Sequence, residues 1–193
     1  MTNKKVFIGI SGKPGVGKNM LASYILRFLL NEQPGGIGYL SFARPLKETV
    51  APFLGLEPEE LDDLEVKNRI HPKSNKTYRQ ILTDLFYSYE ENIGLDFPVE
   101  YLEKRIRQFN SNKFWICSDV RQPYQAEFIL NKGGYLFRLD KDDSWPEDEV
   151  DKKEIESMLD NYPLFTKRLN IDSKFTLASY NLKQITEFLK GKI

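Results

Sequence analysis

The chain has few of the residues that mark whole classes of protein. Its 193 residues include one cysteine, Cys117, and one histidine, His71. A single cysteine excludes an intrachain disulfide framework, and a histidine with no cysteine or second histidine near it gives no basis for a zinc site. The 28 basic side chains are balanced by 28 acidic ones. No net charge therefore draws the chain to nucleic acid or to an anionic membrane.

Long apolar runs are also missing. The apolar stretch near the N-terminus has only about six residues, which is too short for a signal-peptide core or a membrane span. Cys117 lies in the apolar run KFWICSDV, which suits a buried, reduced thiol. We therefore expect a cytoplasmic protein with neither a membrane nor a nucleic-acid partner. The sequence leaves open whether it forms a homodimer.

What the chain does have is an alternation of two apolar patterns. Short apolar runs, most of them apolar on both faces, predict strands at 5–10, 37–42, 113–118, 135–139 and 174–179. Apolar residues at helical spacing predict helices at 18–31, 77–92, 97–110, 125–132 and 181–191. This order predicts an α/β fold with a doubly wound parallel sheet of about five strands, which binds ligands at the carboxyl ends of its strands. The acidic stretch from Asp140 to Glu154 interrupts the pattern, as a solvated loop or as a lid covering about 140–165.

The segment GISGKPGVGKNM follows the first predicted strand. Gly12, Gly17 and Lys18 match the pattern G-x-x-x-x-G-K between a strand and a helix. Glycines let backbone N–H groups converge on a phosphate, and the helix N-terminus and the lysine add positive charge. The alternative is a glycine-rich turn with a surface lysine. The predicted nucleotide-binding residues are Gly12, Lys13, Pro14, Gly15, Val16, Gly17, Lys18, Asn19 and Met20.

Asn19 stands where such loops usually have a serine or threonine whose hydroxyl joins the Mg²⁺ shell. An asparagine carbonyl oxygen could coordinate the metal or hold one of its waters, without the compact geometry of a hydroxyl. Asn19 is therefore a candidate metal ligand, together with Asp119.

Four further segments resemble one family. They are LSFARPLKE at 40–48, TYRQILTDL at 77–85, FWICSDVRQPYQAEFILNKGGYLFRL at 114–139 and FTLASYNLKQITEFL at 175–189. With the loop, they are similar to the deoxynucleoside monophosphate kinases of bacteriophages, a P-loop group that also resembles animal phosphomevalonate kinase. The resemblance spans nearly the whole chain. It implies a P-loop kinase domain shaped as a three-layer sandwich, with an acceptor-binding helical region at about 44–110, and location in the host cytoplasm if a phage encodes the chain.

The chain departs from the family at several positions. That family often has aspartate at position 19 and threonine at position 20, and aspartate is usual at position 44, where this chain has Arg44. Thr83 replaces a glutamine, and the glycine-threonine-glutamate that commonly follows is replaced by FYSYEE. These departures favour, as one alternative, a nucleotide-binding protein without catalytic activity.

The activity that the resemblance implies is transfer of the γ-phosphate of ATP to a deoxynucleoside monophosphate (dNMP), with Mg²⁺. Such a transfer relies on cationic clamps and positioning. The predicted catalytic residues are Lys18, Asp119, Arg121 and Arg138. Arg121 suits the acceptor phosphate because a guanidinium can donate two parallel hydrogen bonds to two phosphate oxygens. Asp119 would hold the magnesium shell or the acceptor, or else cap a helix, and Arg138 would clamp the transferred group, or else form a surface salt bridge.

Other candidates belong to the acceptor side. Arg44 and Lys47 begin a helix after the second strand, where a monophosphate could bind, or where a helix start is simply solvated. Arg79, and with less support Arg69 and Lys67, are further candidates for binding the acceptor. Aromatic residues at helical spacing, which favour core packing over base stacking, are Tyr78, Phe86, Tyr87 and Tyr89. Another acceptor, such as a small phosphate or a hydroxymethylated base in DNA, remains an alternative.

Overall fold

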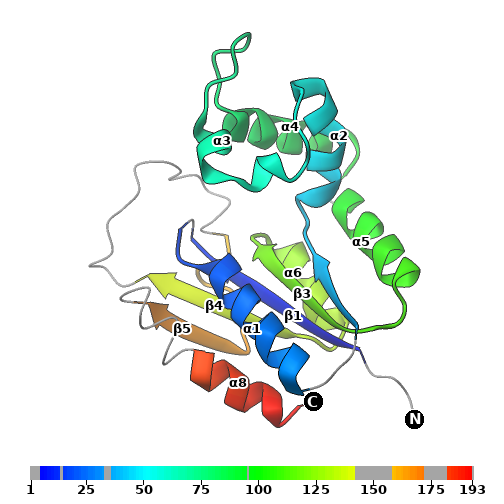
Figure 1. The fold of residues 1–193 in the computed structure, drawn as a ribbon, viewed down its shortest axis with the longest axis vertical. Helices are drawn as coiled ribbons and strands as arrows, with labels where there is room; N and C mark the ends of the chain where they lie inside the picture. The colour runs from blue at the N-terminus through cyan, green and yellow to red at the C-terminus, as the bar shows by residue number, and fades with distance from the viewer. Residues whose placement is uncertain are drawn as a thin grey trace. The chain divides into compact units, whose positions relative to one another are not determined.

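The structure is a computed structural model, and it describes residues 5–13, 15–32, 36–94, 96–141, 158–171 and 182–192. The chain divides into two compact units (Figure 1). The sheet unit comprises Met1–Ser41 and Ile106–Ile193, and the helical unit comprises Phe42–Arg105. None of the described helices is long and apolar enough to cross a bilayer.

The sheet unit is built on five parallel strands in the order β2-β3-β1-β4-β5. Their bounds are β1 Val6–Gly12, β2 Gly36–Leu40, β3 Asn112–Val120, β4 Tyr135–Lys141 and β5 Lys167–Ile171. The order runs outward in both directions from β1, as in a doubly wound sheet. The predicted α/β fold is confirmed.

Both faces of the sheet carry helices (Figure 1). The helices are α1 Lys18–Glu32, α6 Pro123–Asn131 and α8 Leu182–Lys190. Ile8 and Ile10 of β1 pack in one core with residues of α1 and α8. Gly9, between them, faces the other way, since a Cβ there would meet Ile129 of α6. This alternation explains why the predicted strands are apolar on both faces.

The fifth strand of the described sheet was not among the predicted strands. The predicted strand 174–179 lies outside the described residues, and so does 142–157, most of the predicted lid. The fifth strand among the described residues is Lys167–Ile171, which pairs with β4, and the prediction for 174–179 stays untested. Its sequence, KRLNI, is mostly polar because β5 is the last strand in the order. An edge strand needs only one apolar stripe, so it gives little signal.

The helical unit consists of short helices. They are α2 Arg44–Leu54, the 3-10 turn η1 Glu60–Asp62, α3 Leu64–Asn68, α4 Tyr78–Asn92 and α5 Phe97–Gln108, whose residues from Ile106 on are assigned to the sheet unit. A small core of Ala51, Leu61 and Tyr78 holds α2, η1 and α4 together. Thr77 and Gln80 form a capping box that starts α4.

Gly38 in β2 is required by close packing against Trp115 of β3. A Cβ at position 38 would overlap the six-membered ring of Trp115, which is 1% exposed. We expect Gly38→Ala to lower the free energy of unfolding by about 1–3 kcal/mol, because the overpacked strand must shift or the ring must leave its place. Urea unfolding measures this.

Gly191→Ala is the control, since a Cβ there meets nothing closer than the Phe188 carbonyl oxygen at 3.7 Å. It should leave stability within about 0.5 kcal/mol of wild type. Equal effects of the two substitutions would contradict the packing argument.

Candidate functional site

The loop between β1 and α1 has the geometry of a phosphate cradle. Three of its glycines, Gly12, Gly15 and Gly17, have positive φ angles of 148°, 72° and 99°. The Nζ atom of Lys18, the first residue of α1, donates hydrogen bonds to the carbonyl oxygens of Gly12 at 2.5 Å and Lys13 at 2.8 Å. The ammonium is thus held across the loop, beside the first N–H groups of α1, which have no partner within the helix.

The other predicted loop residues fall into three groups. Val16 is buried at 1% exposure and anchors the loop in the core, against which Met20 also packs. Lys13, Gly15 and Asn19 are exposed. Pro14 lies outside the described residues.

The end of β3 lies beside this loop in the sheet order. β3 carries one residue more than β1 here, because Gly9 pairs with Cys117 while Ser11 pairs with Val120. Ser118 and Asp119 lie in this bulge. Such bulges are common next to active sites, where they redirect side chains.

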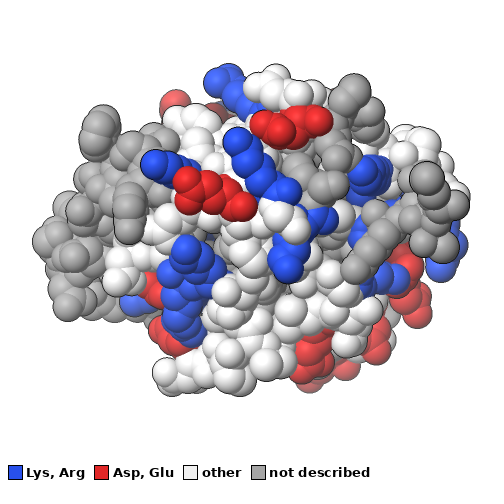
Figure 2. Space-filling view, turned by 90° about the horizontal axis from the view of Figure 1, so that it is seen from below, with Lys and Arg blue, Asp and Glu red and all other residues white. Residues whose placement is uncertain are grey.

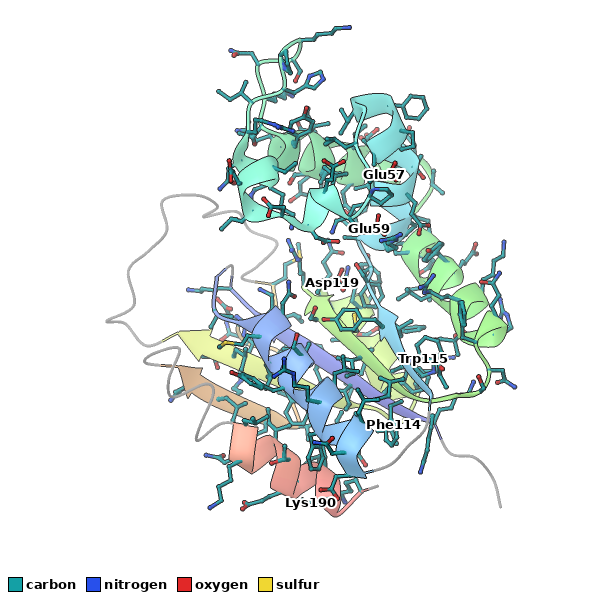
Figure 3. The ribbon with its side chains drawn as sticks, viewed as in Figure 1. Glu57, Glu59, Phe114, Trp115, Asp119 and Lys190 are labelled. Atoms are coloured by element: carbon teal, nitrogen blue, oxygen red, sulfur yellow. The ribbon has the colours of Figure 1, made fainter. Side chains whose placement is uncertain are left out.

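Asp119 is the next-to-last residue of β3 (Figure 3). The predicted strand ended at residue 118, so the sequence had placed Asp119 just after the strand. One carboxylate oxygen accepts a hydrogen bond from the Ser41 hydroxyl at 2.7 Å, and the other accepts one from the Cys117 thiol at 3.1 Å. Helix α6 begins after Gln122, so Asp119 is not its N-cap. At least two donors therefore orient this carboxylate.

Asn19 is linked to β3 through a second contact. Its Oδ1 atom accepts a hydrogen bond from the Ser118 hydroxyl at 2.9 Å, and the Ser118 oxygen accepts one from the Tyr39 hydroxyl at 2.8 Å. Sequence analysis missed Ser118, Tyr39, Ser41 and the role of Cys117. The only signal available was that all four stand at or near the ends of predicted strands.

Arg121 directly follows β3 and is exposed. Its backbone N–H donates to the side-chain oxygen of Gln125 at 2.7 Å, and the N–H of Gln122 donates to the same oxygen at 3.2 Å. Gln125 thereby fixes the turn from β3 into α6, so the backbone of Arg121 is held at the carboxyl edge of the sheet.

Arg138 differs from the sequence expectation. It lies inside β4 and not at its end, and it is 2% exposed, so it forms no surface salt bridge. Its guanidinium donates to Asp140 at 3.0 Å, to Ser11 at 3.1 Å and to Asp160. A buried guanidinium needs such partners because losing hydration without pairing is costly. Its predicted contact with the transferred phosphoryl group is untested.

Arg168 of β5 extends this network. It pairs with Asp140 at 3.2 Å and donates to the backbone carbonyl of Asp160 at 2.5 Å. The two arginines and two aspartates thus tie β4, β5 and the turn at Asp160 to Ser11, the residue before Gly12.

In the helical unit, Arg44 and Lys47 are already paired with carboxylates. Arg44, the first residue of α2, donates to Glu48 at 2.6 Å and to Glu59 at 2.8 Å. Lys47 is 7% exposed and forms an ion pair with Asp62 of η1. Lys47 is therefore not the solvated residue of a helix start, because its ammonium links α2 to η1. Phosphate binding by these two residues stays a prediction.

The charge pairs shift the pKa values in this cluster. Partial burial would raise the pKa of Glu48, but hydrogen bonds from Arg44 and from the Tyr101 hydroxyl at 2.8 Å outweigh it and lower the pKa below its ordinary value. The hydrogen bond from Arg44 also lowers the pKa of Glu59. Burial and the bond to Glu48 raise the pKa of Tyr101.

The remaining acceptor candidates lie around α4. Arg69 caps α3 and places its guanidinium 5.4 Å from the ring centre of Tyr78. Arg79 donates to Asn68 at 3.4 Å, and the Nζ of Lys67 donates to the Asp62 carbonyl at 3.2 Å. His71 contacts the Ser74 hydroxyl at 3.2 Å. Among the described residues, no three histidines, cysteines or carboxylates gather to hold a metal.

The aromatic residues of α4 mainly pack. Tyr78 is buried in the small core at 6% exposure. Phe86 and Tyr89 both contact Phe97, with ring centres 6.1 Å and 5.6 Å apart. Tyr87 is 40% exposed. Base stacking by these rings is not needed to explain their placement.

The surface charge is mixed. On the face shown in Figure 2, basic and acidic side chains of the described residues lie interspersed. This agrees with the equal numbers of basic and acidic side chains in the sequence.

A doubly wound parallel sheet with a G-x-x-x-x-G-K loop at the end of its first strand defines a P-loop protein. Comparison with known proteins takes the classification further. The chain is 30% identical over 172 residues to a "Putative deoxynucleotide monophosphate kinase" of Acanthamoeba polyphaga mimivirus, a match that covers 79% of this chain and 84% of the viral one. The chain belongs to this deoxynucleotide monophosphate kinase family and is a phosphotransferase.

Other comparisons add little. The chain matches no protein-family model. A "putative kinase" from Chloroflexus aurantiacus is 14% identical, covers 98% of this chain and 99% of its own, and has a TM-score of 0.45. Shikimate kinase from Bacteroides thetaiotaomicron is 14% identical over 96% of this chain and 98% of its own, with a TM-score of 0.41. These likenesses are distant, so the family rests on the viral relative.

The ion pair between the buried Arg138 and the half-buried Asp160 yields a stability prediction. Asp160→Asn should lower the free energy of unfolding by about 1–3 kcal/mol, because the buried guanidinium loses one of its two carboxylates while Asp140 remains. Urea unfolding measures the change. In an Arg138→Met background the same substitution should cost less than about 0.5 kcal/mol, since no buried charge is left to compensate. If Asp160→Asn lowered the free energy of unfolding equally in both backgrounds, the interaction between Arg138 and Asp160 would not contribute to stability.

The lowered pKa of Glu48 yields a pH prediction. The folded state binds the Glu48 proton less tightly than the unfolded state does, so this stabilisation is present above the ordinary value of 4.5 and is lost as pH falls through the folded value. Glu48→Gln should therefore be less stable than wild type at pH 7, with a difference that shrinks towards pH 3. Urea unfolding at both pH values tests this.

Glu91→Gln serves as the matched control, because Glu91 is an exposed residue of α4 whose side chain forms no hydrogen bond or ion pair with any residue that the structure describes. Its stability relative to wild type should change little between the two pH values. A difference for Glu48→Gln that stays constant with pH would argue against the lowered pKa.

Proposed function

We propose that the protein transfers the γ-phosphate of ATP to a dNMP, giving ADP and a deoxynucleoside diphosphate. The observation that carries this proposal is the loop at Gly12–Lys18, whose lysine is held across a glycine-rich turn at a helix N-terminus. It occurs in a chain of the same family as the viral protein whose name specifies a deoxynucleotide substrate.

In this proposal the loop binds the phosphates of ATP. Backbone N–H groups of the loop and of the start of α1 contact the β-phosphate, and Lys18 exchanges its carbonyl partners for β- and γ-phosphate oxygens. The carbonyl contacts keep the ammonium in the loop beforehand, so little side-chain entropy is lost when the nucleotide binds.

Mg²⁺ is the metal that ATP chemistry of this kind requires, and the residues present fit it. Asp119 offers an oriented carboxylate, and Mg²⁺ on a nucleotide needs only one or two protein carboxylates besides phosphates and waters. When bound, the metal neutralises charge on the phosphate oxygens. Ser41 and Cys117 contribute by orienting the Asp119 carboxylate.

Arg121 is the cation we propose for the acceptor phosphate, since it is exposed at the carboxyl edge of the sheet and its backbone is fixed by Gln125. Arg44, Lys47, Arg69 and Arg79 stay predictions for acceptor binding, and Arg138 for clamping the transferred group. The family supports a nucleotide acceptor, and nothing in these residues selects the base.

The test is ADP release from Mg²⁺-ATP with each common dNMP offered in turn. We expect turnover with at least one dNMP, and a loss of at least about 100-fold for Lys18→Ala, because the lysine stabilises charge on the transferring group. Circular dichroism of the variant checks that the fold is kept.

Unchanged turnover in Lys18→Ala would remove the loop from the mechanism. If ATP binds but no dNMP is phosphorylated, the acceptor is different, and other small phosphates and DNA become the substrates to assay.

A further inference from the structure

Asn19 is the least usual residue of the phosphate loop, and the structure shows how it is held. The Tyr39 hydroxyl of β2 donates to the Ser118 oxygen at 2.8 Å, and the Ser118 hydroxyl of β3 donates to Asn19 Oδ1 at 2.9 Å. Ser118 is 7% exposed and lies in the bulge of β3. Two consecutive hydrogen bonds thus join β2 and β3 to the second residue of α1.

The direction of these two hydrogen bonds decides which end of the Asn19 amide faces Ser118 and which end faces away from it. A serine hydroxyl has one proton, and because Ser118 accepts from Tyr39, it gives that proton to Asn19. Asn19 must then turn its carbonyl oxygen toward Ser118. Its Nδ2 atom, with two N–H donors, points away from Ser118, in a side chain that is exposed directly after Lys18. The structure records no hydrogen bond from Nδ2 to any described residue.

An outward amide N–H₂ group suits an anion and not a cation. A metal ion would need the carbonyl oxygen, one of whose two lone pairs already accepts the Ser118 proton. A phosphate oxygen needs a donor, and Nδ2 supplies two beside the ammonium of Lys18. The usual serine or threonine has a single hydroxyl that serves the metal at this position.

We propose that Asn19 is a phosphate-binding residue of this kinase and not a metal ligand, with Ser118 and Tyr39 as the positioning residues that fix its amide. Nδ2 donates to a β- or γ-phosphate oxygen of ATP. The proposal rests on the proposed function only in that ATP binds this loop, and it holds whichever acceptor the kinase uses. It differs from the sequence-based prediction of Asn19 as a candidate metal ligand.

The test separates phosphate from metal by measuring ATP affinity twice, by calorimetric titration in excess EDTA and in excess Mg²⁺, with no acceptor present. Asn19→Ala should bind metal-free ATP about tenfold more weakly than wild type, because a hydrogen bond to a charged oxygen is lost. A metal ligand would behave differently, since Asn19→Ala would then match wild type in EDTA and weaken only with Mg²⁺.

Tyr39→Phe tests the positioning role, because it removes one hydroxyl and keeps the ring. It should weaken metal-free ATP binding about threefold in the wild-type background and not at all in the Asn19→Ala background, since its effect passes through the Asn19 amide. A merely structural role of Tyr39 would give the same effect in both backgrounds, and that result would contradict a positioning role of Tyr39 that acts through Ser118 on Asn19.

Two controls keep the outcomes distinct. Lys18→Ala should abolish ATP binding, and if it binds ATP as wild type does, the loop assignment itself fails. If the wild type binds ATP but phosphorylates no dNMP, the proposed reaction fails while the assignment of Asn19 stands. Wild-type binding that occurs only with Mg²⁺, or an Asn19→Ala variant unchanged in EDTA, would overturn the phosphate contact.

Discussion

The close approach of Gly12 to β4 is the constraint on which the site depends. A Cβ at this position would lie 2.6 Å from the Leu139 carbonyl oxygen and 2.9 Å from a methyl group of Val16, and the φ angle of 148° disfavours any side chain. β1 can therefore leave the sheet in a tight turn and place the loop over its own strand end. The Gly12 carbonyl then accepts from Lys18, so the lysine position follows from the backbone of the strand.

Charge pairing is the second organising feature. The chain has equal numbers of acidic and basic side chains, and several cations that suggested phosphate binding are paired within their own unit. Arg138 lies between Asp140 and Asp160, and Lys47 is joined to Asp62. An arginine near the carboxyl edge of the sheet can therefore serve to hold a turn as well as to bind substrate. Arg138 is 2% exposed, so its position is determined by the carboxylates that pair with it inside the fold.

The parts of this structure that could be predicted from sequence are those encoded locally. Four strands and the helices around them follow from apolar runs and helical spacing, and the loop follows from three residues in a fixed pattern. β5 was not predicted because an edge strand with the sequence KRLNI carries one apolar stripe only. The contacts of Asn19 and Asp119 were also out of reach. Ser118 is 99 residues from Asn19 and Ser41 is 78 from Asp119, and no local pattern shows which strand ends become neighbours.

These long-range contacts share one origin, which is the pairing of β2 with β3. Tyr39 and Ser41 come from the end of β2, and Ser118 and Asp119 from the bulge of β3, so one pair of strands positions both polar groups beside the loop. Trp115, packed over Gly38, fixes the register of that pair further back along the strands. A shift of one residue would reverse the side of every β2 side chain. Packing in the core of the sheet therefore determines which hydroxyls reach Asn19 and Asp119.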